Sequence, residues 1–137
     1  MTEFPVTIYH NPDCGTSRNA LAMILAAGYA PRVIDYLGVG WTRPQLEWLF
    51  ATMGAAPREV MREKGTPAAE LGLLDSSIAD AAIIDAMIEH PILVNRPIVV
   101  TPKGVKLCRP SEIVLELLDR APVVFTKEDG EIIRSQS

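Results

Sequence analysis

The sequence predicts an α/β fold in which a β-α-β unit comes first, an all-helical insertion follows, and a β-β-α unit comes last. Two observations lead to this prediction. Runs of β-branched and aromatic residues, typical of strands, occur in two pairs on either side of the middle of the chain. Between these pairs, over about 42–90, apolar residues recur at helical spacing. The chain has 137 residues, and we expect 1–137 to form a single domain.

The β-α-β unit starts with FPVTIYH (4–10), whose composition is typical of a short strand. A helix follows, with Leu21 and Ile24 at helical spacing and with Gly28 where a residue just past a helix end is expected. PRVIDYL (31–37) is the second predicted strand. A strand, a helix and a strand within about 35 residues have the size of a βαβ unit, so the two strands should be parallel.

The insertion is predicted to contain three helices. TRPQLEWLFATMG (42–54) has a threonine and a proline at its start and a glycine at its end, as a capped helix does. PREVMREK (57–64) is a shorter predicted helix, which the following glycine stops. The third helix is expected to begin at Ser77 or Asp80 and to continue to His90.

The β-β-α unit is predicted from PIVVT (97–101), the turn Pro-Lys-Gly, and VKLCR (105–109). This spacing favours a tight antiparallel hairpin. A helix is expected over 110–120. We expect the tail, 121–137, to be extended and loosely packed.

This order of elements describes a thioredoxin-like (glutaredoxin-like) fold with a mixed sheet. Two local features support it: a cysteine, Cys14, at the first strand-to-helix turn, and a proline, Pro97, at the start of the third strand. In that fold the proline faces the cysteine and its peptide bond is usually cis. We therefore expect a cis bond before Pro97, which would place Arg96 next to Cys14.

Composition excludes several classes of protein. A net charge of −4 argues against sequence-independent nucleic-acid binding. The cysteines Cys14 and Cys108 are far apart and neither has a neighbour at metal-ligand spacing, so we expect no disulfide framework, no metal and no bound cofactor. No apolar run reaches the roughly 18 residues of a membrane span, and the first residues have no signal-peptide pattern. The expected location is the cytoplasm.

Cys14 is the candidate nucleophile. It lies at the first turn of the predicted helix, where free backbone N–H groups and the helix dipole stabilise a thiolate and lower the pKa of the thiol. We expect His10 to add positive charge beside it. The alternative, a buried structural cysteine, would not need the surrounding HNPxCGTSRN pattern. In the same loop, which starts at Asn11, Gly15 lets the backbone approach an anion closely, and Thr16 and Ser17 supply hydroxyl donors beside the sulfur.

Three arginines are candidate substrate ligands. Arg62 lies in the helical insertion, Arg96 precedes Pro97, and Arg109 ends the last predicted strand. Several arginines around one thiolate make little sense for disulfide exchange but suit a tetrahedral oxyanion, which arginine binds by bidentate, charge-assisted hydrogen bonds. For Arg18, one helical turn after the cysteine, two interpretations stay open: a further arginine at the site, or a residue of the protein surface.

The loop lacks the second cysteine of a thiol–disulfide enzyme, because Ser17 stands where that cysteine would be. A covalent adduct on Cys14 must then be resolved by a thiol from another molecule. Alternation along the last strand puts Cys108 and Arg109 on opposite faces. If Arg109 faces the site, Cys108 belongs to the core.

Three stretches, IYHNPDCGTSRNAL, EHPILVNRPIVVTPKGVKLCRPSE and FTKEDGE, closely resemble the glutaredoxin-coupled arsenate reductases of bacteria. The resemblance extends from about Thr7 to Glu131. It implies that Cys14 attacks arsenate to form a covalent adduct, that glutathione acts as co-substrate and displaces oxygen, and that glutaredoxin reduces the mixed intermediate so that arsenite leaves.

The resemblance also assigns roles to individual residues. The family's three substrate-binding arginines correspond to Arg62, Arg96 and Arg109. His10 corresponds to the histidine that helps to keep the thiolate charged, and Ser17 to a nearby hydroxyl.

Two other functions fit the same fold. Redox-sensing regulators that bind a protein partner such as RNA polymerase resemble the first β-α unit, but they typically carry CxxC, and Ser17 argues against them. A general glutathione-dependent thiol oxidoreductase would tolerate loss of the arginines. A related reductase with another substrate also stays open.

Overall fold

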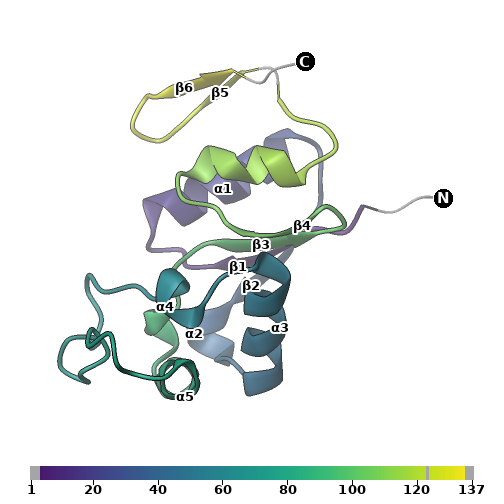
Figure 1. Cartoon of the computed structure of the whole chain (residues 1–137). Coiled ribbons are helices and arrows are strands. Elements are labelled where there is room, and N and C mark those ends of the chain that lie inside the picture. The colour runs from purple at the N-terminus through teal and green to yellow at the C-terminus, as the bar shows by residue number, and fades with distance from the viewer. Residues whose placement is uncertain (1–3, 123, 135–137) are drawn as a thin grey trace. The chain divides into compact units, whose positions relative to one another are not determined.

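The computed structural model describes residues 4–122 and 124–134, which divide between two compact units (Figure 1). One unit contains the chain up to Asp35 and from Arg96 onward, and the other contains Tyr36–Asn95. The second unit is wider than the insertion expected over about 42–90. Whether 1–137 acts as a single domain stays a prediction.

The first unit is built on a four-stranded mixed sheet. Its strands are β1 (Thr7–His10), β2 (Arg32–Asp35), β3 (Ile98–Thr101) and β4 (Gly104–Leu107), in the order β2-β1-β3-β4. Strand β1 is parallel to β2 and antiparallel to β3, and β3 is antiparallel to β4. This is the mixed sheet that the thioredoxin-like class requires, so the predicted fold class is confirmed.

Helix α1 (Gly15–Ala26) and the 3₁₀ helix η2 (Ser111–Leu117) pack together against this sheet (Figure 1). Helix α1 buries Ala20, Met23 and Ile24, which share one face because they are three and four positions apart. It ends at Ala26, and just beyond it Gly28 has a φ of 94°, which a residue with a side chain rarely adopts. The core also contains Val6, Ile8, Val99, Cys108, Val114 and Leu117.

The helix expected over 110–120 needs a correction in type and length. The structure instead has a 3₁₀ helix, η2, that stops at Leu117. Side chains of the β3–β4 turn take the carbonyl groups at its end. Thr101 Oγ1 donates to the Leu117 carbonyl at 2.6 Å, and Lys103 Nζ donates to the Leu118 carbonyl at 3.1 Å. These carbonyls are therefore satisfied without a further helical turn.

The tail is extended, as predicted, but within 124–134 it packs more closely than expected, while 123 and 135–137 lie outside the described residues. Strands β5 (Val124–Thr126) and β6 (Ile132–Arg134) form an antiparallel hairpin, and Phe125 and Ile133 pack against the core. Lys127 is 9% exposed and forms an ion pair of 2.7 Å with Glu112 of η2. Apolar contacts and a largely buried ion pair thus attach the tail to the first unit.

The second unit is helical, with α2 (Tyr36–Val39), α3 (Arg43–Met53), α4 (Pro57–Val60), α5 (Asp80–Glu89) and the 3₁₀ helix η1 (Pro91–Leu93). Helix α3 begins as predicted, because Thr42 and Gln45 form a capping box, and it ends at Gly54 in the left-handed conformation. Of the two starts considered for the third helix, Asp80 is the observed one.

Several boundaries differ from those predicted: β1 begins at Thr7 and not at 4, and β4 ends at Leu107 and not at 109. The second strand ends at Asp35 and not at 37, since Tyr36 begins α2 and its hydroxyl donates to the Val94 carbonyl at 3.2 Å. Helix α4 ends at Val60 and not at 64, because Met61 pairs with Val94 in an isolated β-bridge. A long-range contact to Val94 thus accompanies the change at both points, from a side-chain hydroxyl at Tyr36 and from backbone pairing at Met61. Among the residues that the structure describes, none of the helices has the length and hydropathy needed to cross a bilayer.

The capping box of α3 leads to a stability prediction. Thr42→Ala should lower the free energy of unfolding by about 1 kcal/mol, because the Gln45 amide loses its side-chain acceptor. Urea denaturation followed by circular dichroism measures this. Thr52→Ala, at an exposed position in the last turn of α3, is the matched control and should be neutral or stabilising. Equal effects of the two substitutions would contradict the capping role.

Candidate active site

The candidate site lies at one edge of the sheet in the first unit. The end of β1 lies beside the end of β2, because these strands are parallel, with His10 opposite Asp35. It also lies beside the start of β3, because β1 and β3 are antiparallel, with Tyr9 opposite Ile98. The end of β4 reaches the same edge, with Leu107 opposite Ile98. The segments that follow or precede these strand ends therefore meet at one place.

Cys14 occupies the N-cap position of α1, at the end of a tight loop. Its φ and ψ of −104° and 120° are extended, and helical geometry starts at Gly15. Asn11 organises the loop, since its carbonyl accepts from the Cys14 amide at 3.0 Å and its Oδ1 accepts from the Asp13 amide at 2.9 Å. The side-chain bond is typical of an Asx turn. The buried Asn11 thus places the sulfur at the helix N-terminus.

Two of the three predicted arginines contact the sulfur. Arg109 Nη1 lies 3.6 Å from Cys14 Sγ and also donates to the Arg96 carbonyl at 2.9 Å. The Arg96 side chain hydrogen-bonds to the same sulfur. The Arg96–Pro97 peptide bond is cis, as expected, and so is the Arg109–Pro110 bond, which the sequence did not indicate. The third strand's start and the fourth strand's end thus each supply one guanidinium group.

These contacts decide the protonation of Cys14. Burial, with 8% of the residue exposed, raises the pKa of the thiol. Hydrogen bonds from the Arg96 side chain, the Ser17 backbone and the Arg109 side chain outweigh burial and lower the pKa from 9.0 to about 7. A large fraction of the sulfur is therefore thiolate at neutral pH, which makes Cys14 a competent nucleophile.

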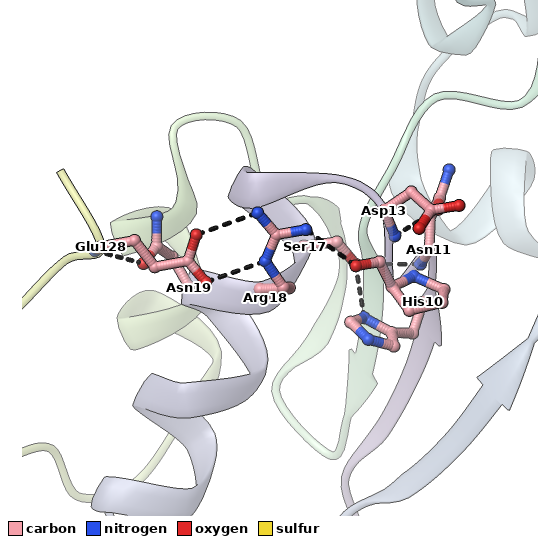
Figure 2. A network of polar contacts seen from close by, with 8 residues as sticks. His10, Asn11, Asp13, Ser17, Arg18, Asn19 and Glu128 are labelled. Atoms are coloured by element: carbon pink, nitrogen blue, oxygen red, sulfur yellow. Dashed lines mark hydrogen bonds and ion pairs between the residues drawn. The ribbon is translucent and has the colours of Figure 1, made fainter.

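His10 differs from its expected electrostatic role. Its Nδ1 lies 2.6 Å from Ser17 Oγ, which already accepts from the Asn11 amide at 3.1 Å (Figure 2). Burial lowers the pKa of His10, and although Asp35 raises it, the net direction is downward. A neutral imidazole accepts the remaining Ser17 hydroxyl hydrogen. The lowered pKa disfavours the positive charge expected on His10, whose role stays a prediction, and the ring contacts the loop through Ser17.

Other predicted loop residues contribute less directly. Gly15 has no left-handed φ, and a Cβ built on it would meet Arg18 at 3.6 Å and Glu128 at 3.8 Å, which are ordinary contacts. Thr16 is half-buried in the first helical turn. Their roles as anion-binding groups stay predictions.

Arg62 belongs to the second unit. Its backbone amide donates to the Leu93 carbonyl at 2.7 Å, and its guanidinium group donates to the Lys64 carbonyl at 3.1 Å and to Asn95 Oδ1 at 3.5 Å. The cluster around Cys14 described above is made by residues of the first unit alone. Whether Arg62 belongs to the site therefore stays a prediction.

Cys108 lies in the core and Arg109 at the sulfur, as strand alternation predicted. Burial raises the pKa of Cys108 to about 12, so this thiol is unsuited to nucleophilic chemistry. Within 4–122 and 124–134, histidine, cysteine, aspartate and glutamate side chains form no group of three arranged to bind a metal.

Sequence reasoning did not find two acidic residues near the site. Asp35 acts on His10 from the end of the neighbouring strand, and the parallel pairing of β1 and β2 would have indicated it. Glu128, from the C-terminal hairpin, binds Arg18 beside the loop (Figure 2). Only the tertiary structure brings that hairpin to α1.

A thiolate at a strand-to-helix turn, two guanidinium groups around it and a thioredoxin-like sheet define a thiol-dependent enzyme site suited to an oxyanion. Comparison with known proteins agrees. The model of the ArsC family matches residues 9–117, and the chain belongs to this family.

Named relatives cover almost the whole chain. The arsenate reductase ArsI1 of Synechocystis sp. is 63% identical over 97% of this chain and 93% of its own length. An arsenate reductase of Escherichia coli is 53% identical over 96% of this chain and 94% of its own length. Among solved structures, an arsenate reductase from Vibrio cholerae superposes with a TM-score of 0.81 at 42% identity, covering 85% of this chain and all, 100%, of that one.

The lowered pKa of Cys14 predicts its alkylation by iodoacetamide. The rate should rise with pH to a half-maximum near 7, because the thiolate is the reacting form. Peptide mass spectrometry separates Cys14 from Cys108. The chain unfolded in guanidinium should give a midpoint near the ordinary 9.0, and Arg109→Gln should move the folded midpoint toward that value. A folded midpoint near 9 would contradict the described hydrogen bonds.

The electrostatics of His10 predict an imidazole that stays neutral at pH 7. Its ring proton resonances should titrate below the ordinary 6.5, because burial outweighs the carboxylate of Asp35. Asp35→Asn should lower the midpoint further, since the raising influence is removed. A midpoint above 6.5 in the unmodified chain would restore the cationic role of His10.

Proposed function

We propose that the chain reduces arsenate to arsenite and that Cys14 is the nucleophile. The observation that carries the proposal is the buried sulfur, with a pKa of about 7, between the side chains of Arg96 and Arg109. Membership of the ArsC family and relatives named arsenate reductase at 53% and 63% identity support the choice of substrate.

Substrate binding uses charge. Arsenate is a tetrahedral oxyanion, and guanidinium groups bind such anions through pairs of hydrogen bonds with fixed geometry. Arg96 and Arg109 lie at the sulfur and would hold arsenate oxygens there. Free N–H groups at the start of α1 add donors for developing negative charge. Arg62 is the proposed third arginine.

The first chemical step forms a bond between Cys14 sulfur and arsenic. The thiolate donates its electron pair to arsenic(V), and one arsenate oxygen leaves as water after it takes up protons. Because the pKa of Cys14 is about 7, no separate base is needed to generate the nucleophile at neutral pH. His10 and Ser17 hold the loop in place during this step.

Reduction of arsenic(V) to arsenic(III) requires two electrons, and one cysteine cannot supply them by closing a disulfide alone. Ser17 replaces the nearby second thiol, and Cys108 is buried with a pKa of about 12. A second thiol must therefore come from outside. We propose glutathione, which displaces another oxygen from the adduct, and then glutaredoxin, which reduces the mixed intermediate; the two electrons come from thiols that become a disulfide.

The proposed reaction needs thiol partners that are found in the cytoplasm. Glutathione and glutaredoxin maintain reduced thiols in the cytoplasm, which is where we place the protein. Its role there would be arsenic detoxification.

The test is arsenite release from arsenate by purified protein, with glutathione and glutaredoxin supplied together and then omitted one at a time. We expect turnover only when both are present. Cys14→Ser should abolish turnover, and Cys108→Ser should retain it, because Cys108 takes no part in the reaction. Turnover that persists in Cys14→Ser would overturn the proposal.

The arginines separate this function from general glutathione-dependent thiol exchange. Arg109→Gln should lower kcat/KM for arsenate by about 10- to 100-fold, since a hydrogen bond to a charged group contributes roughly 1.5–3 kcal/mol. A general thiol oxidoreductase would instead reduce a glutathione mixed disulfide equally well with Arg96→Ala or Arg109→Ala. Intact turnover in both variants would favour that alternative.

A further inference from the structure

The hairpin β5–β6 reaches the candidate active-site loop through one side chain, Arg18 (Figure 2). Arg18 Nε donates to Glu128 Oε2 at 2.8 Å and Nη2 donates to Oε1 at 3.0 Å, so two parallel bonds orient the guanidinium plane. The remaining nitrogen, Nη1, donates to the Pro12 carbonyl at 2.8 Å. One planar group thus joins Glu128 to the residue two positions before Cys14.

Arg18 also contacts the loop through its backbone. Its amide donates to the Cys14 carbonyl at 2.9 Å and closes the first turn of α1. The Glu128 amide donates to Asn19 Oδ1 at 3.0 Å, so the hairpin turn holds two successive residues of α1. A Cβ added to Gly15 would lie 3.6 Å from Arg18 Nη2 and 3.8 Å from Glu128 Oε1, so the Arg18–Glu128 pair lies over the start of the helix.

The hairpin does not depend on this pair for its attachment. Lys127, 9% exposed, binds Glu112 at 2.7 Å, and Phe125 and Ile133 pack against the core. The Arg18–Glu128 pair is about half exposed, at 43% and 49%, and exposed ion pairs contribute little to stability. Any effect of the Arg18–Glu128 pair is therefore expected at the loop that Arg18 holds.

The loop has an inner and an outer side. Asn11, which is buried, holds the inner side by bonds to the Asp13 and Cys14 amides. Pro12 and Asp13 are exposed, and Arg18 holds this outer side by the Pro12 carbonyl. A shift of the loop would move the sulfur relative to the groups that stabilise it, and misplacement by 1 Å costs a rate of the order of 100-fold.

We propose that Glu128 is a positioning residue for the nucleophile: it orients Arg18, which holds the Pro12 carbonyl and so keeps Cys14 aligned with Arg96 and Arg109. The inference rests on the proposed function in one respect, that Cys14 is the nucleophile. Glu128 itself touches neither the sulfur nor the arginines that surround it in the described contacts.

A double-mutant cycle tests this inference. Glu128→Gln and Arg18→Gln should each lower kcat for arsenate reduction by about 3- to 10-fold and leave KM for arsenate unchanged, because neither residue binds substrate. The double variant should be no slower than either single variant, since both act through one contact. It has the net charge of the unmodified chain, so a return to the full rate would show a charge effect and overturn positioning.

Amide hydrogen exchange gives a second readout that needs no turnover. The Asp13 and Cys14 amides should exchange faster in Glu128→Gln and in Arg18→Gln, while the amides of β1 and β3 stay unchanged. Unmodified protein without arsenate reductase activity would refute the proposed function, and the exchange rates would still test the inference about the loop.

Glu116→Gln is the matched control. It removes a carboxylate from another exposed ion pair, Lys106–Glu116, which has the same 2.8 Å separation and does not contact the loop. We expect kcat and loop exchange to be unchanged in this variant. The inference is overturned if Glu128→Gln leaves both quantities unchanged, if Glu116→Gln alters them equally, or if exchange increases throughout the first unit.

Discussion

The hydrogen bonds to the Cys14 sulfur are the interaction on which the rest of the site depends. With 8% of the residue exposed, a charged sulfur loses most of its hydration and has to receive donors from the protein. Three segments distant in sequence supply them: the first turn of α1, Arg96 two positions before β3, and Arg109 two positions after β4. The order β2-β1-β3-β4, with antiparallel pairing of β3 to both neighbours, is what brings these segments to one edge.

In this site, the positive charge at the sulfur and the support of the loop come from different residues. The positive charge facing the sulfur comes from the guanidinium groups of Arg96 and Arg109, and arginine serves as a fixed charge in proteins. His10 is buried, which lowers the pKa of its imidazole, and it contacts the loop through the Ser17 hydroxyl. This division suits a reaction on an oxyanion, because the binding charge then does not change when protons move. The reactive sulfur itself is the group that titrates near neutrality.

The absence of a second thiol beside Cys14 also suits the proposed reaction. In the proposed reaction, an internal disulfide would have to be reduced before Cys14 could act again, whereas external thiols leave Cys14 as a free thiol when arsenite departs. Cys108 shows why a second cysteine in the chain is insufficient, because its place in the core makes it inaccessible and raises its pKa. Chemistry here depends on which thiol is surrounded by donors, and not on how many thiols the chain contains.

The sequence by itself determined the mixed sheet, the helix after Cys14, the capped helix α3 and the core position of Cys108, because each depends on local patterns of apolar, capping and alternating residues. It also identified Arg96 and Arg109 as residues at strand ends. Only the tertiary structure decided the burial of His10 and the lowered pKa that follows from it, the docked C-terminal hairpin, the early ends of β2 and α4, and the link from Glu128 to the loop. These features depend on burial and on pairs distant in the chain, such as Arg18 with Glu128, which no local pattern encodes.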